Sequence, residues 1–402
     1  MVENKDKKVL NVPNLRFKEF EGEWKSCKLG AVVVVVGGGT PDTNNHKYWN
    51  GDIQWFTPSE IGRDKYVTNS LRTISEEGLN KSSAKLLPIG TILLSSRATV
   101  GECSINKVEC TTNQGFQSLI PKEYFSKEFV FYLMQTKRKE LIRKSCGSTF
   151  LEISANEVRK IEIAVPTYKE QEKISKLLAL LDERISTQNK IIDKLQSLIK
   201  GIMVELQKQG QNKGNWRNVL LSKVLTERDE RNTNFYQVFS VSVSRGVINQ
   251  VDYLGRSFAA RDTSKYNVVH YGDLVYTKSP TGAYPYGIVK QNLNQENVAV
   301  SPLYGVYIPN SLSVGTYLHE YFMSEINTHN YLHPLIQKGA KNTINITNQR
   351  FLENSVPMPV CANELLLISN LLLSFNEKIK YQKSILQQYQ KQKQYLLRQM
   401  FI

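Results

Sequence analysis

Two short patterns in this sequence have the residue types that chemistry requires. The glycine run Gly37–Gly39, followed by Thr40 and Pro41, comes directly after a valine-rich stretch, where a phosphate-binding loop could lie. Such a loop needs a Lys followed by a Ser or Thr after its last glycine, and this pair is missing. Pro41 also prevents a smooth continuation into a helix. The run therefore does not predict nucleotide binding.

The second pattern is the pair His329 and His333, which would share one face of a helix. A metal site needs further ligands, but Pro334 follows directly and no third ligand lies nearby. The sequence also lacks an Asn-Pro-Pro-Tyr methyltransferase signature, a pair of carboxylates spaced to share a metal ion after Asp42, and a Gly-x-Ser-x-Gly nucleophile turn. We therefore expect no catalytic residue and no metal ion in this chain.

Basic, amide and hydroxyl side chains do accumulate in glycine-bearing segments. Arg, Lys, Asn and Gln hydrogen-bond base edges in the major groove, and Ser, Thr and Lys bind phosphates. For any single Arg or Lys, a merely solvated surface position is the more common alternative. The mixture as a whole favours DNA binding by Arg63, Ser96, Arg97, Thr99, Asn113, Gln114, Gln117, Arg143, Lys144, Arg245, Arg261, Lys278, Ser279, Thr281, Tyr284, Lys338, Lys341 and Asn342.

Composition points to the same class of partner. Among 402 residues, 52 Lys and Arg outnumber 37 Asp and Glu, and the resulting charge of +15 is spread along the chain. This excess favours a polyanionic partner, with an incidentally basic protein as the alternative. The longest apolar stretch, Leu29 to Val36, is too short to cross a bilayer, and the first residues form no signal peptide, so we expect a cytoplasmic protein. Scattered cysteines without a Cys-x-x-Cys spacing predict buried thiols.

The sequence contains an internal repeat, in which its second half resembles its first. The segment Trp24–Leu29 has a counterpart in Trp216–Leu221. The stretch from Leu87 to Arg97 reads like that from Val268 to Lys278, with a turn glycine, an apolar strand, small polar residues and a cation. Arg97 and Lys278 are therefore expected to occupy the same place in the two halves. A repeat of this length predicts two domains with one topology.

The helical part of the repeat is its most regular part. Apolar residues follow a 4-3 alternation over several heptads, as in a coiled-coil seam, and Gln188 and Gln382 stand at the same step of the two seams. Tyr389 and Lys393 replace aliphatic residues late in the second seam, whose last turns are expected to be weaker. The spacer seam comprises Ile174, Leu178, Leu181, Ile185, Ile192 and Leu195 in the first helix, and Ile368, Leu372, Phe375, Ile379, Leu386 and Tyr389 in the second.

These landmarks predict a duplicated α/β (α+β) fold with two globular domains separated by two long antiparallel coiled-coil helices and related by pseudo-twofold symmetry. Further helices are expected at 130–143 and 315–335 within the domains. The predicted divisions are an N-terminal segment at 1–23, a first globular domain at 24–150, a first helical spacer at 151–208, a glycine-bearing linker at 209–215, a second globular domain at 216–343 and a second helical spacer at 344–402.

The ordered motifs resemble those of the specificity subunit of type I restriction-modification enzymes. Gly38–Pro41 followed by Tyr48–Trp55 resembles the opening of a target-recognition domain in that family. The segments Gly90–Gly101, Asn113–Phe116 and Gln171–Ile174 are also typical of it. The second half departs from this pattern, since it has no Gly-Gly-Thr-Pro and Ser-Pro-Leu-Tyr at 301–304 stands where Asn-Gln-Gly-Phe is usual.

The resemblance implies a non-catalytic subunit whose two target-recognition domains read double-stranded DNA. It further implies two methyltransferase (modification) subunits docked on the helical pair and two ATP-driven restriction and translocase subunits, around a single copy of this chain. S-adenosylmethionine, ATP and Mg2+ would then belong to those subunits, and no cofactor to this chain. A fused methyltransferase or nuclease, and a coiled-coil scaffold with incidental basic charge, are the alternatives.

The two long helices suggest how such readers could be spaced. Helices from about 168 to 207 and from about 363 to 402 would each be about 60 Å long. Antiparallel pairing would put one domain at either end, and readers facing successive major grooves lie about 34 to 36 Å apart. We therefore expect an asymmetric target made of two unlike short sites separated by bases that are not read.

Overall fold

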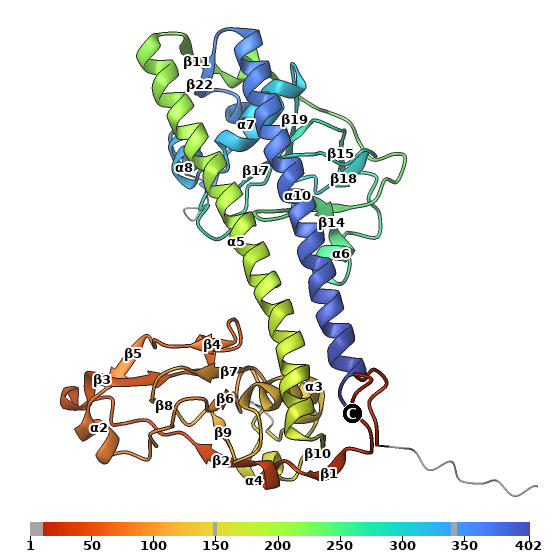
Figure 1. Ribbon diagram of the computed structural model, residues 1–402. Helices are drawn as coiled ribbons and strands as arrows, with labels where there is room; N and C mark the ends of the chain where they lie inside the picture. The colour runs from red at the N-terminus through yellow and green to blue at the C-terminus, as the bar shows by residue number, and fades with distance from the viewer. Residues whose placement is uncertain (1–10, 148–150, 339–343) are drawn as a thin grey trace, which may run out of the picture. The chain divides into compact units, whose positions relative to one another are not determined.

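The computed structural model describes residues 11–147, 151–338 and 344–402. The chain divides into two compact units, one formed by the residues up to Thr187 together with Leu386–Ile402 (unit 1) and the other by Gln188–Ile385 (unit 2). Each unit combines a globular part with a segment of two long helices, α5 (Tyr168–Lys213) and α10 (Ala362–Gln399) (Figure 1). No helix in the three described ranges has the length and apolar character needed to cross a membrane.

Unit 1 is built on a five-stranded sheet of order β2-β9-β6-β7-β4, accompanied by a three-stranded sheet of order β5-β3-β8. Strands β1 and β10 form a separate antiparallel pair. Along the chain, β1 comes before the strands of both sheets and β10 comes directly before α5. The strands are β1 (Lys25–Lys28), β2 (Val33–Gly37), β3 (Trp49–Phe56), β4 (Tyr66–Val67), β5 (Arg72–Ile74), β6 (Ile92–Leu94), β7 (Cys103–Asn106), β8 (Cys110–Thr112), β9 (Gln117–Pro121) and β10 (Glu162–Val165). The short helices are α1 (Leu29–Val32), α2 (Glu76–Asn80) and α4 (Ala155–Arg159).

Helix α3 (Lys127–Arg143) packs on the large sheet and confirms the helix predicted at 130–143. The Ser126 hydroxyl caps its first turn by accepting a hydrogen bond from Phe129 N. Every residue from Phe129 to Met134 is buried, so this stretch is covered on all sides. Phe401 stacks on Phe129 with 5.2 Å between ring centroids. The core of unit 1 therefore joins the sheet, α3 and the last residues after α10 in one cluster.

Unit 2 repeats this topology. Its main sheet, of order β12-β19-β16-β17, matches β2-β9-β6-β7, and the pair β11 with β22 matches β1 with β10. The elements are β11 (Trp216–Leu220), β12 (Leu225–Glu227), β13 (Phe239–Ser242), β14 (Gly246–Asn249), α6 (Gln250–Leu254), β15 (Asn267–Val269), β16 (Leu274–Tyr276), β17 (Val289–Gln291), β18 (Val298–Val300), β19 (Gly305–Pro309), α7 (Leu312–Tyr321), α8 (Glu325–Leu332), β20 (Gln337–Lys338), β21 (Ile344–Asn345), α9 (Asn348–Phe351) and β22 (Ser355–Pro359). The predicted duplication is confirmed.

The repeat extends to single hydrogen bonds. In unit 1 the indole nitrogen of Trp24 donates to Glu170 in α5 at 3.3 Å. In unit 2 the indole nitrogen of Trp216 donates to Glu364 in α10 at 2.9 Å. Each globular part is thus fixed to the start of the long helix that follows it by the same pair of residue types.

Turn and loop positions coincide as well. Gly90 before β6 and Gly272 before β16 have φ values of +89° and +90°, a backbone conformation that glycine adopts without steric cost. Residues 113–116 join β8 to β9, and residues 301–304 join β18 to β19. The sequence comparison that placed Ser-Pro-Leu-Tyr opposite Asn-Gln-Gly-Phe is therefore confirmed by topology.

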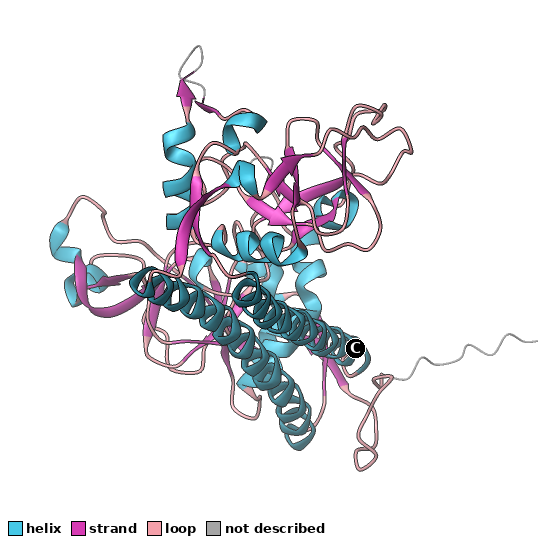
Figure 2. Cartoon of the chain, turned by 90° about the horizontal axis from the view of Figure 1, so that it is seen from above, coloured by secondary structure: helices cyan, strands magenta, loops and turns pink. Residues whose placement is uncertain are grey.

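The predicted seam of the long helices is also confirmed. All the side chains assigned to it are buried or half-buried, and the two polar steps meet, because Gln188 Nε2 donates to the side-chain and main-chain oxygens of Gln382. In unit 1, Asp182 contacts Lys393 and Arg184 contacts Tyr389. Residue numbers therefore rise along one helix as they fall along the other, so the paired segments are antiparallel. Figure 2 shows these segments side by side.

Two predicted helix limits are wrong. The segment expected as a linker at 209–215 is helical as far as Lys213, because its Gln and Lys residues are good helix formers. Its Gly210 packs under Trp216, where an added Cβ would lie 2.3 Å from the indole ring. The long helices are also unequal, with 46 residues in α5 and 38 in α10.

The helix expected at 315–335 is two helices, α7 and α8. The chain leaves α7 after Tyr321, and the Ser324 hydroxyl begins α8 by accepting a hydrogen bond from Asn327 N. Thr328 Oγ1 donates to the carbonyl of Phe322 at 2.8 Å and so ties the second helix back to the end of the first. The apolar pattern alone did not mark this serine as a helix start.

Candidate nucleic-acid interface

Two loops of unit 1 that carried the sequence motifs meet at one end of the sheets. The main-chain nitrogen of Gly39 donates to the carbonyl of Thr112 at 2.8 Å, and Thr40 Oγ1 donates to Gln114 Oε1 at 2.5 Å. A Cβ at Gly38 would lie 2.0 Å from the carbonyl oxygen of Asn113, so only glycine allows this approach. The Gly-Gly-Thr-Pro and Asn-Gln-Gly-Phe segments therefore form one surface.

A third loop, Ser95–Thr99, joins this surface at the end of β6. The main-chain nitrogen of Ser96 donates to the carbonyl of Gly115 at 2.8 Å, which holds this loop against the Asn-Gln-Gly-Phe segment. Thr99 is exposed, and its hydroxyl donates to Ser95 Oγ at 3.1 Å. Ala98 between them has φ of +57°, a strained value for a residue with a side chain. We call these three segments the unit 1 loop surface.

Arg97 connects the unit 1 loop surface to the end of α3. Its Nε lies 2.8 Å from Glu152, and its side chain is 42% exposed. The main chain of Glu152 in turn pairs with that of Cys146, just after Arg143 and Lys144. Six predicted DNA-binding residues are thus brought to one region of unit 1, namely Arg97, Thr99, Asn113, Gln114, Arg143 and Lys144.

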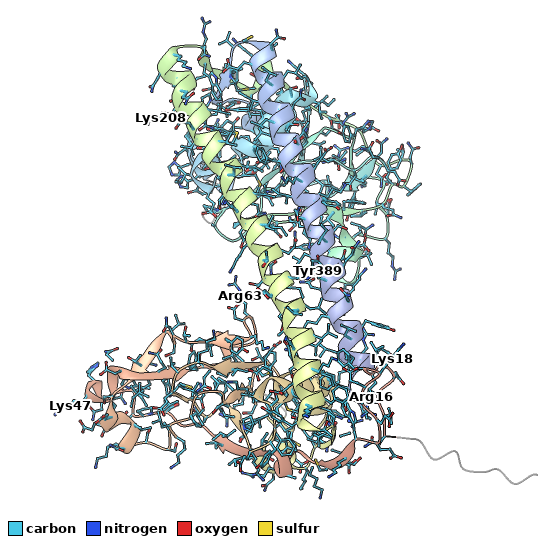
Figure 3. The ribbon with its side chains drawn as sticks, viewed as in Figure 1. Arg16, Lys18, Lys47, Arg63, Lys208 and Tyr389 are labelled. Carbon is cyan, nitrogen blue, oxygen red and sulfur yellow. The ribbon has the colours of Figure 1, made fainter. Side chains whose placement is uncertain are left out.

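The other three residues predicted to bind DNA in unit 1 do not lie together on the unit 1 loop surface. Ser96 is wrong, because its side chain is fully buried and has no surface to offer DNA. Gln117 is half-buried in β9, with its Oε1 enclosed beside Gly37. Arg63 is exposed, but it extends from a separate loop before β4 (Figure 3). In a strand, neighbouring side chains point to opposite faces, and sequence alone did not show which face is covered.

In unit 2, Lys278 is only half-exposed, and burial lowers its pKa. The matched strands β6 and β16 place Lys278 opposite Ser96, so its expected equivalence with Arg97 is wrong by one residue. Tyr284 is also wrong as a DNA contact. It is buried, and its hydroxyl donates to the carbonyl of Met323 at 2.7 Å.

The remaining predictions in unit 2 are scattered. Ser279 is exposed and Thr281 half-exposed at the tight turn after β16, whereas Arg245 and Arg261 are exposed on either side of α6. Lys338 ends β20, while Lys341 and Asn342 lie outside the described residues. The second surface is therefore less compact than the first in the part of the chain that the structure describes.

Comparison with known proteins finds similarity in the first half of the sequence. The model of the type I restriction modification DNA specificity domain matches residues 21–197. The specificity subunit of the type I restriction enzyme MjaIX from Methanocaldococcus jannaschii is 38% identical over 180 residues, which is 43% of this chain and 42% of that protein. The EcoR124I/EcoR124II specificity subunit from Escherichia coli is 32% identical over 175 residues, which is 42% of this chain and 43% of that protein. Each match thus spans less than half of the relative.

Residues 21–197 are thus similar in sequence to a type I restriction modification DNA specificity domain. The fold of the whole chain is that of a type I S subunit. The S subunit of the type I restriction-modification system from M. genitalium superimposes with a TM-score of 0.60 at 12% identity, over 97% of this chain and 99% of that one. A chain solved in work on complex assembly and conformational transition of the type I R-M system gives 0.52 at 15% identity, over 94% and 97%.

The globular part of unit 1 is fixed to the long helices by a polar cluster that the sequence did not reveal. Asp182 in α5 lies 2.6 Å from Lys393 in α10 and accepts a hydrogen bond of 2.6 Å from the Tyr132 hydroxyl. Lys65 donates to the same hydroxyl at 3.0 Å, and burial lowers the pKa of Lys65. Lys393 thus has a partner within unit 1, so the last turns of α10 are fixed to α5 although their seam residues are polar.

Unit 2 has a different cluster at its matching position. Asn376, which stands in the seam pattern where Asp182 does, donates to Glu320 in α7 at 2.7 Å. Burial raises the pKa of Glu320 and lowers that of the neighbouring Lys290 to about 8. Burial also lowers the pKa of His319 to about 3, so this ring is neutral and accepts from Gln291 N at 3.0 Å. Both clusters are structural.

The candidate metal pair forms part of an aromatic contact. The rings of His329 and His333 stack with 5.2 Å between centroids, and Tyr286 lies against both. In the described ranges, no group of three or more His, Cys, Asp or Glu side chains is placed to hold a metal ion. Cys103 and Cys110 are buried thiols as predicted, but Cys146 and Cys361 are exposed because they lie in loops.

Proposed function

We propose that this chain reads an asymmetric bipartite site on duplex DNA as the specificity subunit of a type I restriction-modification complex, with one half-site for each unit. The observation on which the proposal rests is that the two units share their main-sheet topology but have different loops. Both units share the order of four strands in the main sheet and the same Trp-to-Glu anchor, yet Gly-Gly-Thr-Pro and Asn-Gln-Gly-Phe occur only in unit 1. Equivalent frames with unlike loops suit two readers of unlike sequences.

We further propose that α5 and α10 set the spacing of the half-sites and dock two methyltransferase subunits, to which two restriction subunits are added. Both helices carry exposed apolar residues beside the seam. Leu180, Ile191 and Leu198 recur at a spacing that returns to one face of α5, and Leu367 and Leu371 are exposed on α10. Such exposed rows favour partner helices.

In this proposal the chain carries no catalytic group. S-adenosylmethionine would be bound by the methyltransferase subunits, and ATP and Mg2+ by the restriction subunits. The alternative hypothesis, that this chain is itself a methyltransferase or nuclease, requires the purified chain to bind S-adenosylmethionine or a divalent metal ion by itself. Calorimetry with each ligand is expected to give no heat of binding, and saturable binding of either ligand would contradict the non-catalytic role.

The test of DNA reading uses the full chain together with its methyltransferase. Duplexes with random sequence are selected by the complex and then sequenced. We expect an enriched site of two unlike elements at a fixed separation. A coiled-coil scaffold with incidental charge would instead retain all duplexes alike and lose them together as salt is raised. Equal retention of every sequence would contradict the proposal.

A further inference from the structure

Helix α6 of unit 2 and the loop that follows it expose apolar side chains that no residue within 11–147, 151–338 or 344–402 covers. None of the residues of α6 is buried, although it contains Val251 and Leu254, which are 51% and 45% exposed. Phe258 follows in the loop and is 58% exposed. We call Val251, Tyr253, Leu254, Arg256 and Phe258 the α6 patch. Several large apolar side chains exposed within one short segment favour a binding partner.

Cations are interleaved with these apolar side chains. The Arg256 guanidinium lies over the Phe258 ring, 4.5 Å from its centroid, and that of Arg245 lies 5.6 Å from the ring centroid of Tyr253. Arg261 and Lys265 are exposed nearby, opposed by the acidic Asp252 and Asp262. Basic residues thus outnumber acidic ones from 245 to 265. An anionic partner that also offers flat apolar surfaces matches this combination, and duplex DNA has both properties.

The loop is held in place without covering the patch. Gly255 ends α6 with φ of +74°. Gln250 Oε1 then accepts hydrogen bonds from Phe258 N at 2.7 Å and from the Ser257 hydroxyl at 3.3 Å. The Tyr266 hydroxyl accepts one from Ala260 N at 3.1 Å. Because the backbone is already fixed, binding through Phe258 costs little conformational entropy.

The patch lies in a segment where the two units differ. Helix α2 follows β5 in unit 1 as α6 follows β14 in unit 2. From α2 the chain reaches the turn before β6 through residues 81–89, whereas unit 2 uses 255–266 and then β15. Unit 1 instead has the longer connection between the paired strands, at 57–71, where Leu71 is 86% exposed. In each unit, the segment that is longer than its counterpart in the other unit thus carries exposed apolar side chains.

We propose that the α6 patch reads the second half-site from the minor groove, with Phe258 as an apolar wedge at a base step and Arg256 beside it in the groove. This inference rests on the proposed function and adds to it the residues that set the specificity of unit 2. Apolar wedges flanked by arginine are a common means of reading the minor groove through the deformability of a base step.

The test compares Phe258→Ala and Arg256→Ala with the control Ile326→Ala. Ile326 is an equally apolar side chain on α8 of the same unit, 72% exposed and outside the patch. Each full-length variant, with its methyltransferase, is titrated with the selected target and with duplexes changed at one base pair at a time. Phe258→Ala should weaken binding about tenfold and flatten discrimination in one half-site only. Ile326→Ala should change neither quantity.

Hydroxyl-radical footprinting gives the second readout, because it reports minor-groove contact directly. Protection in the second half-site is expected to shrink in Phe258→Ala and to stay in Ile326→Ala. Unchanged affinity and discrimination in both Phe258→Ala and Arg256→Ala would overturn the inference while leaving the proposed function intact. A loss of complex assembly with an unchanged footprint would assign the patch to a partner protein and also overturn it. Failure of the unsubstituted complex to discriminate any site would instead contradict the proposed function.

Discussion

Lengthening both long helices by one heptad should lengthen the preferred spacer of the DNA target. The boundary between the two units falls at Thr187 and Gln188 in α5 and at Ile385 and Leu386 in α10. Contacts such as Gln188 to Gln382 and Arg184 to Tyr389 put these two points at nearly the same level of the antiparallel pair. Seven residues inserted at both points keep the 4-3 phase of the seam, whereas a four-residue insertion shifts it.

The size of the effect follows from helix geometry. Seven residues add about 10.5 Å at 1.5 Å per residue, which corresponds to about three base pairs at 3.4 Å each. Three base pairs also turn the duplex by roughly 100°, while the heptad turns the helix face by only about 20°. The DNA must twist to restore both contacts, so binding should weaken even at the new optimum.

The assay is methylation by the complex on duplexes whose spacer is varied one base pair at a time. We expect the optimum to move up by about three base pairs and the peak rate to fall. A control with the heptad in α5 alone should lose the optimum altogether, because the seam can no longer pair over its whole length. A folded double-insertion variant that methylates at the original spacing would refute the spacing role of the helices.

Three further outcomes test individual contacts. Arg97→Ala should weaken target binding by about 1 to 3 kcal/mol if Arg97 reads a base. If Arg97 binds a phosphate, the slope of log binding constant against log salt concentration should fall by about one. Titrations at several salt concentrations that show neither change would remove Arg97 from the interface. Glu364→Ala should speed hydrogen exchange across Trp216–Leu220, because the indole loses its acceptor, while Glu364→Gln should retain slow exchange; equal exchange in both variants would contradict the anchor. Burial lowers the pKa of Lys290 to about 8, so the folded state binds fewer protons than the unfolded state between about pH 8 and 10.5, and stability should rise with pH across that window. Lys290→Met should remove this rise and gain about 3 kcal/mol below pH 8, which denaturant unfolding of the two proteins at pH 7 and pH 10 measures, and parallel pH profiles would contradict the burial argument.

The sequence predicted the duplication and the seam because both depend on local periodicity. The 4-3 alternation that begins at Ile174 requires no knowledge of what lies against it, and the same holds for its copy from Ile368. Lys393 looked like a weak point of this seam. Its partner Asp182 could be identified only once the antiparallel register was known, since the two residues are far apart in sequence.

Individual interface residues were harder to predict. Ser96 and Tyr284 are residue types that bind DNA, but Ser96 is fully buried and the Tyr284 hydroxyl donates to the Met323 carbonyl, which sequence alone does not show. The equivalence of Arg97 with Lys278 was off by one residue, because the matched strands β6 and β16 place Lys278 opposite Ser96. The α6 patch was missed because exposed Val251 and Phe258 look like core residues in sequence.

The most direct test of two unlike readers on one chain is to sequence the methylated sites in a host that expresses this chain with its methyltransferase. We expect two different short elements separated by a constant number of unspecified bases. Replacing the globular part of unit 1 with that of the M. jannaschii relative should change one element and leave the other as it was. A palindromic or continuous site, or a change in both elements on that replacement, would contradict it.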